Sequence, residues 1–210
     1  MKPNNLMAAA VGTGLLWFGW FGFNAGGAYQ AGNLAAVAFA NTFIALASGM
    51  VTWTIYARLV RAKFDFVDVM TGSVAGLATI TPIAGYIEPY KAVLVGIVAG
   101  IICNIALSFQ EKKGWDDALG VWGVHGIGGF TGTILIGLLA DKEIHGVSAS
   151  LQQLKIQVGG VIFVALYAFI LTAIILKLLS HVMRIKPSDE QIQQGLDETL
   201  LNEQTYDLNP

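Results

Sequence analysis

The sequence has few charged residues. Of its 210 residues, 12% are Asp, Glu, Lys or Arg and 55% are hydrophobic, whereas soluble domains carry about 25% charged residues. This composition excludes a water-soluble globule. The charges are also unevenly spaced, since no Asp, Glu, Lys, Arg or His lies between Lys2 and Arg58. An uncharged stretch of that length is typical of membrane-spanning helices.

Cysteine pairs and catalytic motifs are also lacking. The single Cys103 excludes a disulfide framework and a multi-cysteine metal site. Nothing resembles a Walker loop, a dinucleotide fingerprint or a nucleophile elbow, so we expect neither an enzyme nor a resident cofactor or metal. The hydrophobic run after Lys2 is much longer than that of a signal peptide, so the first span is expected to stay in the bilayer.

The uncharged stretches predict an all-α membrane protein with six spans. Crossing a hydrocarbon core about 30 Å thick takes roughly 20 helical residues. The first stretch is long enough for two helices, and four later stretches take one each. The expected spans are 6–26, 34–57, 66–86, 90–109, 118–140 and 155–183. We therefore predict a transmembrane domain over residues 1–184 and a tail over residues 185–210.

Basic residues predict the orientation of the spans. Alternating the loops between two sides gathers most of them on one side, and only Lys91 and Lys142 lie clearly on the other. The richer side holds Lys2, Arg58, Arg61, Lys63, Lys112, Lys113, Arg184 and Lys186. By the positive-inside rule this side is cytoplasmic, together with both termini and the acidic tail. The basic excess is too small for a nucleic-acid surface.

Glycine pairs four residues apart recur within the spans. They are Gly22 and Gly26, Gly72 and Gly76, Gly96 and Gly100, and Gly128 and Gly132. Small residues at this spacing let helix backbones approach closely, either in ordinary membrane packing or around a pore. For any single pair, ordinary packing is the favoured interpretation.

An aromatic ladder lies near the predicted outer end of the first span. Leu16, Trp20, Phe23 and Gly27 recur at intervals of four, three and four, which places them on one helix face. Aromatic faces attract cations, so Trp20 and Phe23 are candidates to receive a small cation. Trp and Tyr also form interfacial belts in most membrane proteins, and the composition alone favours that alternative.

His125 is the ionisable residue expected deepest in the fifth span. It follows Asp117 by eight residues, or about 12 Å of helix, and Val121 shares its face. Intramembrane ionisable groups usually face a cavity or a partner, and histidine exchanges protons near neutral pH. A structural histidine bonded to another helix is an equal alternative. A haem site is disfavoured, because His145 is expected in the outer loop and His181 near the cytoplasmic end of the sixth span, so that neither reaches the depth of His125.

Two further features predict helix ends. Asp116 and Asp117 precede the fifth span, where carboxylates cap free amides and suit the positive end of the helix dipole. Pro82 lies near the outer end of the third span and predicts a kink or a helix end there.

These segments together resemble the second half of the ammonium transporter (Amt/Mep/Rh) family. The resemblance rests on Trp17-Phe18-Gly19-Trp20-Phe21-Gly22-Phe23-Asn24-Ala25-Gly26, Ala78-Thr79-Ile80-Thr81-Pro82, Asp116-Asp117, Val124-His125-Gly126-Ile127-Gly128-Gly129 and Gly195-Leu196-Asp197. Members have eleven helices in two inverted five-helix repeats plus a last helix. This chain is similar to the second repeat plus the last helix.

The resemblance implies transport of ammonium or ammonia, with methylammonium as an analogue. It places Trp20 and Gly27 at an outer recruitment site, Phe23 at a gate, His125 in a pore, and Leu16 and Val121 in the apolar pore wall. Many members have serine where this chain has Gly27, so a cation that sheds water at this position lacks that hydroxyl acceptor. Plasma-membrane homotrimers and a regulatory tail that responds to PII-type proteins are also implied, the tail residues here being Gly195, Leu196, Asp197 and Tyr206.

The resemblance also indicates what this chain lacks. In the family, a partner histidine, a second gate aromatic and an outer tryptophan come from the first repeat. We therefore expect a fragment, a split-gene product or a half that needs a complementary chain. The alternative function is a non-conducting assembly or regulatory subunit.

Overall fold

A computed structural model describes residues 3–203, and the regular elements in this range are helices. They are α1 (Leu6–Gly26), α2 (Asn33–Arg61), α3 (Phe66–Ile80), α4 (Pro89–Lys113), the π-helix η1 (Trp122–Gly126), α5 (Ile127–Leu139), α6 (Lys142–His145), α7 (Leu151–Val182), α8 (Asp189–Gln194) and the π-helix η2 (Asp197–Leu201). The chain forms two units, one ending at Val161 and the other beginning at Ile162. The predicted domain boundary at residue 184 stays a prediction.

Five of the expected spans are helices long and apolar enough to cross a membrane. These are α1, α2, α4, η1 with α5, and α7. The third span differs from the prediction of 66–86, because α3 has 15 residues and ends at Ile80, with turns from residues 81 to 86. Pro82 lies two residues after Ile80 and accounts for the end, since a proline ring clashes with the preceding helical turn and lacks an N–H. The fifth span begins at Trp122 and not at residue 118.

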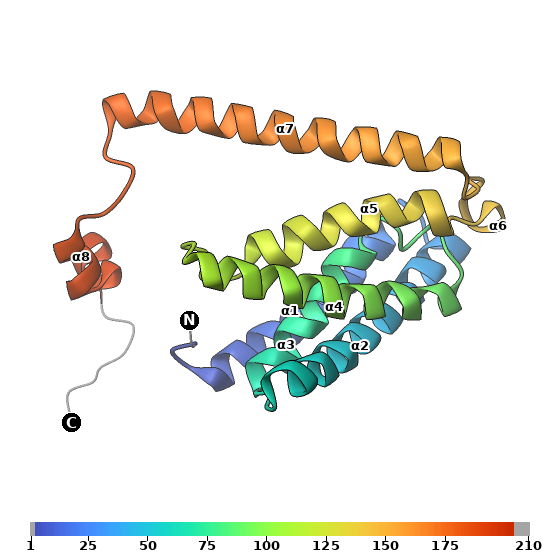
Figure 1. Cartoon of the computed structure of the whole chain (residues 1–210), viewed down its shortest axis with the longest axis horizontal. Helices are drawn as coiled ribbons and strands as arrows, with labels where there is room; N and C mark the ends of the chain where they lie inside the picture. The colour runs from blue at the N-terminus through green and yellow to red at the C-terminus, as the bar shows by residue number, and fades with distance from the viewer. Residues whose placement is uncertain (1–2, 204–210) are drawn as a thin grey trace. The chain divides into compact units, whose positions relative to one another are not determined.

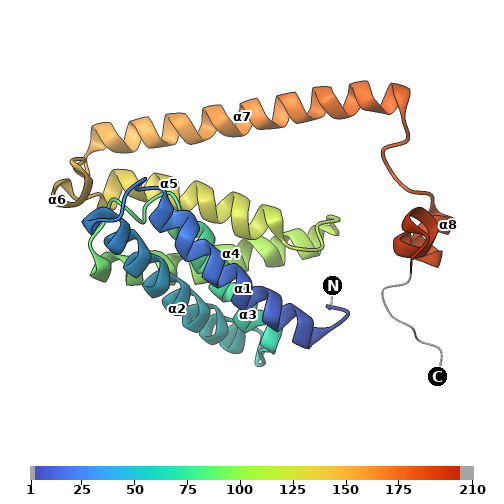
Figure 2. The same ribbon diagram turned by 180° about the vertical axis from the view of Figure 1, so that it is seen from behind.

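In the first unit, α1 to α5 form a bundle in which α2 packs against α3 and α4 (Figure 1). Figure 2 shows the same bundle from behind, with α1 beside α2 and α3. The most buried side chains of this bundle belong to α2, α3 and α4. Each of the following is at most 2% exposed: Ala45, Trp53, Leu77, Ile80 and Val95. In contrast, α1 has no buried residue. The core of this unit therefore lies among α2, α3 and α4.

The predicted glycine pairs of α3 and α4 make this core possible. A Cβ on Gly76 would collide with the carbonyl oxygen of Ala45 in α2, and one on Gly72 with the side chain of Trp53. A Cβ on Gly100 would lie 2.8 Å from the Cβ of Thr52. These glycines therefore serve close helix packing. Gly22 differs, because a Cβ there meets nothing within 4 Å.

The two ends of the bundle are held by different polar contacts. At the end where α6 lies, which we call the α6 end, Lys91 donates to Asp141 at 3.1 Å and the Asp141 amide donates to the Tyr86 carbonyl at 2.7 Å. At the opposite end, which we call the Arg61 end, Arg61 pairs with Asp68. The structure thereby joins the loops between α3 and α4 and between α5 and α7 at the α6 end.

Replacing Gly76 with alanine should lower the thermal stability of the chain. The added methyl group forces α2 and α3 apart, and overpacking of this kind costs about 1–3 kcal/mol. Gly22→Ala is the matched control, expected to be neutral or slightly stabilising because alanine favours a helix and finds open space. Melting of both purified variants in detergent tests this, and equal melting temperatures would contradict the packing role.

Candidate functional site

Two indole hydrogen bonds hold α1 against α3. Trp17 Nε1 donates to the Ser73 hydroxyl at 2.9 Å, and Trp20 Nε1 donates to the Thr81 hydroxyl at 2.7 Å. The Trp20 ring also packs on the buried cluster that contains Trp53 and Val124. Both tryptophans lie in the aromatic segment of the first predicted span, but the sequence analysis did not predict their hydrogen-bond partners. Through these contacts α3 fixes the rotation of α1.

His125 lies in the π-helix η1, next to Trp20. The rings of Trp20 and His125 are stacked, with centroids 5.9 Å apart and planes 21° apart. The amide of Ile127 donates to the carbonyl of Trp122, five residues earlier, which widens this turn. Val124 is buried while His125 is exposed. The wide turn therefore presents the imidazole on the surface of the unit, against the indole.

The predicted site residues on α1 and η1 face the outside of this unit. Leu16 is 44% exposed, Phe23 69% and Val121 50%. The Trp20 ring meets the Phe23 ring edge-on at 6.1 Å, so Trp20 bridges Phe23 and His125. Within residues 3–203, the imidazole makes no hydrogen bond and packs on the Trp20 ring. The face combines apolar side chains with one ionisable ring.

A groove of about 490 Å³ runs from His125 toward the Arg61 end. It passes Leu16 and Thr13 of α1, Val67 and Val74 at the α3 side, and Leu119 before η1. Apolar side chains dominate its lining. Gly27 lies elsewhere, on a separate cavity at the α6 end. The structure therefore brings Leu16, Trp20, Phe23 and His125 to one face and leaves Gly27 beyond its end.

Asp117 caps the segment that carries His125. Its two carboxylate oxygens accept the amides of Val121 and Trp122, each at 2.9 Å. Partial burial acts to raise the pKa of Asp117, but the hydrogen bonds from Trp122 and Val121 outweigh it, and the pKa lies below the ordinary 3.8. Asp116 is exposed. Of the two adjacent carboxylates, Asp117 is therefore the capping residue.

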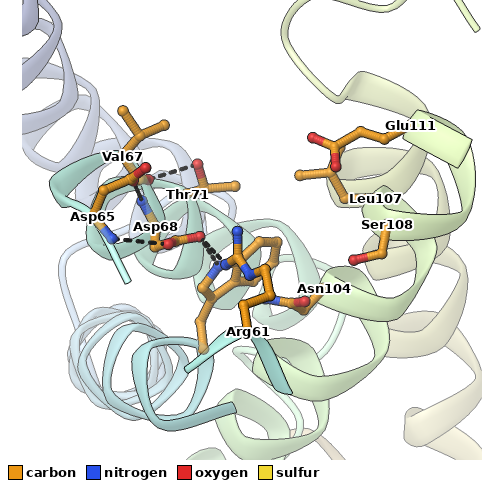
Figure 3. A pocket seen from close by; sticks show the side chains of 10 residues that line it. Arg61, Asp65, Val67, Asp68, Thr71, Asn104, Leu107, Ser108 and Glu111 are labelled. Atoms are coloured by element: carbon orange, nitrogen blue, oxygen red, sulfur yellow. Dashed lines mark hydrogen bonds and ion pairs between the residues drawn. The ribbon is translucent and has the colours of Figure 1, made fainter. Parts of the chain in front are cut away.

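A polar pocket of about 140 Å³ at the Arg61 end was not predicted. Figure 3 shows Arg61, Asp65 and Asp68 on one side of it and Ser108 and Glu111 of α4 on the other. Asp65 and Asp68 cap the start of α3 reciprocally, and Asp68 also accepts from the Trp53 indole at 3.2 Å. The acidic pair three residues apart before an apolar run is the sequence signal for this cap.

The tail residues form a separate local structure in the second unit. Gly195 has φ of +105°, and its carbonyl accepts from the Thr199 hydroxyl at 2.8 Å. Leu196 precedes η2, which begins at Asp197. Tyr206 lies outside the described residues. Among residues 3–203 no three His, Cys, Asp or Glu side chains are grouped so that they could hold a metal ion.

Sequence comparison identifies the family. The model of the Ammonium Transporter Family matches residues 1–206. This chain belongs to the ammonium transporter family. It is 40% identical to a putative ammonium transporter of Methanothermobacter thermautotrophicus and 39% identical to an ammonium transporter of Aquifex aeolicus. These alignments cover 99% and 98% of this chain but 53% and 50% of the two relatives.

Solved structures of the family share the fold. A crystal structure of Candida albicans Mep2 gives a TM-score of 0.84 at 35% identity, over 90% of this chain and 45% of that chain. A structure described as a sensor Amt protein gives 0.86 at 34% identity, over 92% of this chain and 49% of that chain. The chain therefore spans about half the length of the relatives that it matches.

Replacing Asp117 with alanine should destabilise the chain at neutral pH. The loss of a helix cap costs about 1 kcal/mol, or roughly 2–4 °C in melting temperature for a chain of this size. Because the pKa of the folded state lies below 3.8, the carboxylate stabilises above that pH and loses its effect as the pH falls through the lowered pKa.

Melting temperatures of the parent and Asp117→Ala should therefore converge on acidification below that pKa. Asp116→Ala, at the exposed neighbour, is the control and should melt like the parent at both neutral and acidic pH. A gap between the parent and Asp117→Ala that is as large in acid as at neutral pH would contradict a capping role for the ionised carboxylate.

Proposed function

We propose that this chain forms one half of an ammonium-conducting unit, with its pore along the face of α1 and η1. The stacked pair of Trp20 and His125 on an exposed face of membrane-spanning helices is the observation that carries the proposal. An ionisable ring within the bilayer is costly and normally faces a cavity or a partner. A complementary set of helices over this face would supply both.

The mechanism follows from the cost of charge in hydrocarbon. An ammonium ion is strongly disfavoured there, whereas neutral ammonia is small and only weakly polar. The ion is received by the aromatic rings of Phe23 and Trp20 and gives up its proton to water at the outer mouth. Ammonia then passes between apolar residues such as Leu16 and Val121, beside the imidazole of His125, and is protonated again at the far side.

His125 and Trp20 have distinct roles in this proposal. Stacking on the indole fixes the plane of the imidazole and leaves the ring edge, where both nitrogen atoms lie, open to a substrate or to a second ring. The Trp20 indole is itself fixed by Thr81, so the stack is rigid. In this arrangement Trp20 receives the substrate together with Phe23 and forms the wall beside the imidazole.

The tail and the assembly are part of the same proposal. The chain is placed in the plasma membrane as a homotrimer, with both termini in the cytoplasm and the segment from Gly195 to Asp197 facing that side. PII-type proteins are the proposed regulators of the tail. The positive charges of the Arg61 end support this orientation, since Arg58 and Arg61 end α2 and Lys112 and Lys113 end α4.

Joining a first half to this chain should create transport that the chain alone lacks. We would fuse the half of the Aquifex aeolicus relative that precedes the matched region to residue 1, and express the fusion and the chain alone in cells without their own ammonium transporters. The fusion should accumulate labelled methylammonium at least tenfold faster than the chain alone. Equal uptake with equal membrane levels would contradict a half-pore, and no uptake by the fusion would favour a non-conducting subunit.

Within that fusion, His125→Ala should reduce methylammonium uptake at least tenfold while leaving membrane insertion intact. Among residues 3–203, the substitution removes the one ionisable ring on the face of α1 and η1. His181→Ala is the control, because His181 is exposed and bonds the Lys177 carbonyl of its own helix. If His125→Ala transports like the parent and like His181→Ala, the imidazole has no role in conduction.

A further inference from the structure

The polar pocket at the Arg61 end has two walls that differ in how their polar groups are paired. On the wall formed by the end of α2 and the start of α3, Asp68 accepts from the Trp53 indole and from Arg61. Asp68 Oδ2 also accepts the Asp65 amide at 3.0 Å, and Asp65 Oδ1 accepts the Asp68 amide at 3.1 Å. The ionic side chains on this wall are therefore held by one another.

The opposite wall is a stripe of α4 whose polar side chains have no partner. Asn104, Ser108 and Glu111 line the pocket, and their intervals of four and three residues place them on one helix face. Within residues 3–203, none of the three side chains takes part in a hydrogen bond or an ion pair. Figure 3 shows Ser108 and Glu111 across the pocket from Asp65. This wall therefore offers polar groups that the described chain does not satisfy.

Asn104 is the most buried of the three. It is 4% exposed, yet its amide has no hydrogen-bond partner among residues 3–203. Its Nδ2 atom is fully enclosed, so Oδ1 is the amide atom that reaches the open space of the pocket. Buried polar groups are normally hydrogen-bonded, because an unmade bond in the interior is costly. The amide oxygen at the base of the pocket therefore indicates a ligand that donates a hydrogen bond.

The charges of the lining determine the sign of that ligand. Arg61 and Asp68 neutralise each other, which leaves an excess of negative charge at the rim, where Asp65 and Glu111 are exposed. A carboxylate and an amide oxygen only accept hydrogen bonds, and a serine hydroxyl can accept one. The described chain groups no three His, Cys, Asp or Glu side chains that could hold a metal ion. The lining therefore fits an organic cation with N–H donors.

We propose that this pocket binds a guanidinium group, with Glu111 pairing with its charge and with Ser108 and Asn104 accepting its N–H groups. The acceptors lie on successive turns of α4. A guanidinium presents several N–H donors in a planar fork and is more weakly hydrated than an ammonium, so it can reach more than one acceptor at once. The volume of about 140 Å³ admits such a group. The site contains neither Trp20 nor His125 and is separate from the proposed pore.

The site can be tested on the full chain alone. All of its lining residues belong to the first unit, and a ligand that binds the folded state raises the melting temperature. In lipid nanodiscs, millimolar methylguanidinium chloride should raise the melting temperature by about 2 °C or more over equimolar sodium chloride. Because guanidinium salts otherwise weaken folding, a rise reports specific binding. Methylammonium should give a smaller rise, and tetramethylammonium, which has no N–H donor, should give none.

Substitutions on α4 locate the binding. Glu111→Gln removes the exposed carboxylate and should abolish the methylguanidinium shift. Glu88→Gln is the matched control, because Glu88 precedes the other end of the same helix and makes no side-chain capping bond there, and it should keep the shift. Asn104→Leu should also lose the shift. If that variant does not fold, Ser108→Ala tests the neutral acceptors, since it removes a half-buried hydroxyl, and it should diminish the shift.

N-acetylarginine amide distinguishes the two sources of a guanidinium group. A shift as large as that of methylguanidinium assigns the pocket to an arginine side chain of a polypeptide, and its absence assigns the pocket to a free small compound.

Equal melting of the parent in methylguanidinium and in sodium would overturn the site. An equal shift with tetramethylammonium would also overturn it, because charge alone would then account for the effect. An equal shift with methylammonium would overturn the assignment to a guanidinium. A shift that survives in Glu111→Gln, or that disappears in Glu88→Gln, would overturn the placement of the ligand in this pocket.

Discussion

The structure depends on the close approach of α2 to α3 and α4. Helices in a bilayer gain little from burying apolar side chains, because lipid tails are equally apolar, so contact between backbones has to supply the association. Here the absence of side chains at Gly72, Gly76 and Gly100 lets α2 sit against both neighbours. The polar network of Trp53, Asp68 and Arg61 closes one end of the same contact.

A core concentrated in three helices leaves α1 and η1 free to present a functional surface. Among residues 3–203, the indoles of Trp17 and Trp20 tie α1 to Ser73 of α3 and to Thr81 at its end, and large apolar residues of α1 such as Leu15, Phe18 and Phe23 stay exposed. In a soluble protein such a face would promote aggregation. Under the proposed function, this face is the surface that a complementary set of helices covers.

The sequence predicted the parts of this fold that depend on periodicity and charge. The uncharged stretches located α1 with its observed bounds, and the spacing of Leu16, Trp20 and Phe23 predicted their common face. The sequence pattern did not predict contacts between segments that are far apart along the chain. The stacking of Trp20 on His125 and the cavity around Asn24 at the α6 end join residues of α1 to partners far along the chain. The end of α3 at Ile80 required knowing that Pro82 stops the helix and does not merely bend it.

The π-helix at Trp122–Gly126 has a consequence for how the bundle tolerates insertions and deletions. A wide turn contains one residue more than a regular α-helix needs to cover the same rise. Removing that residue would restore a regular helix but rotate everything on one side of it by about 100°. Either the capping of this segment by Asp117 or the close packing of Gly132 against the Thr79 carbonyl would then be lost. The π-helix therefore lets the imidazole and the packing face of α5 point in independent directions around the axis of one continuous helix.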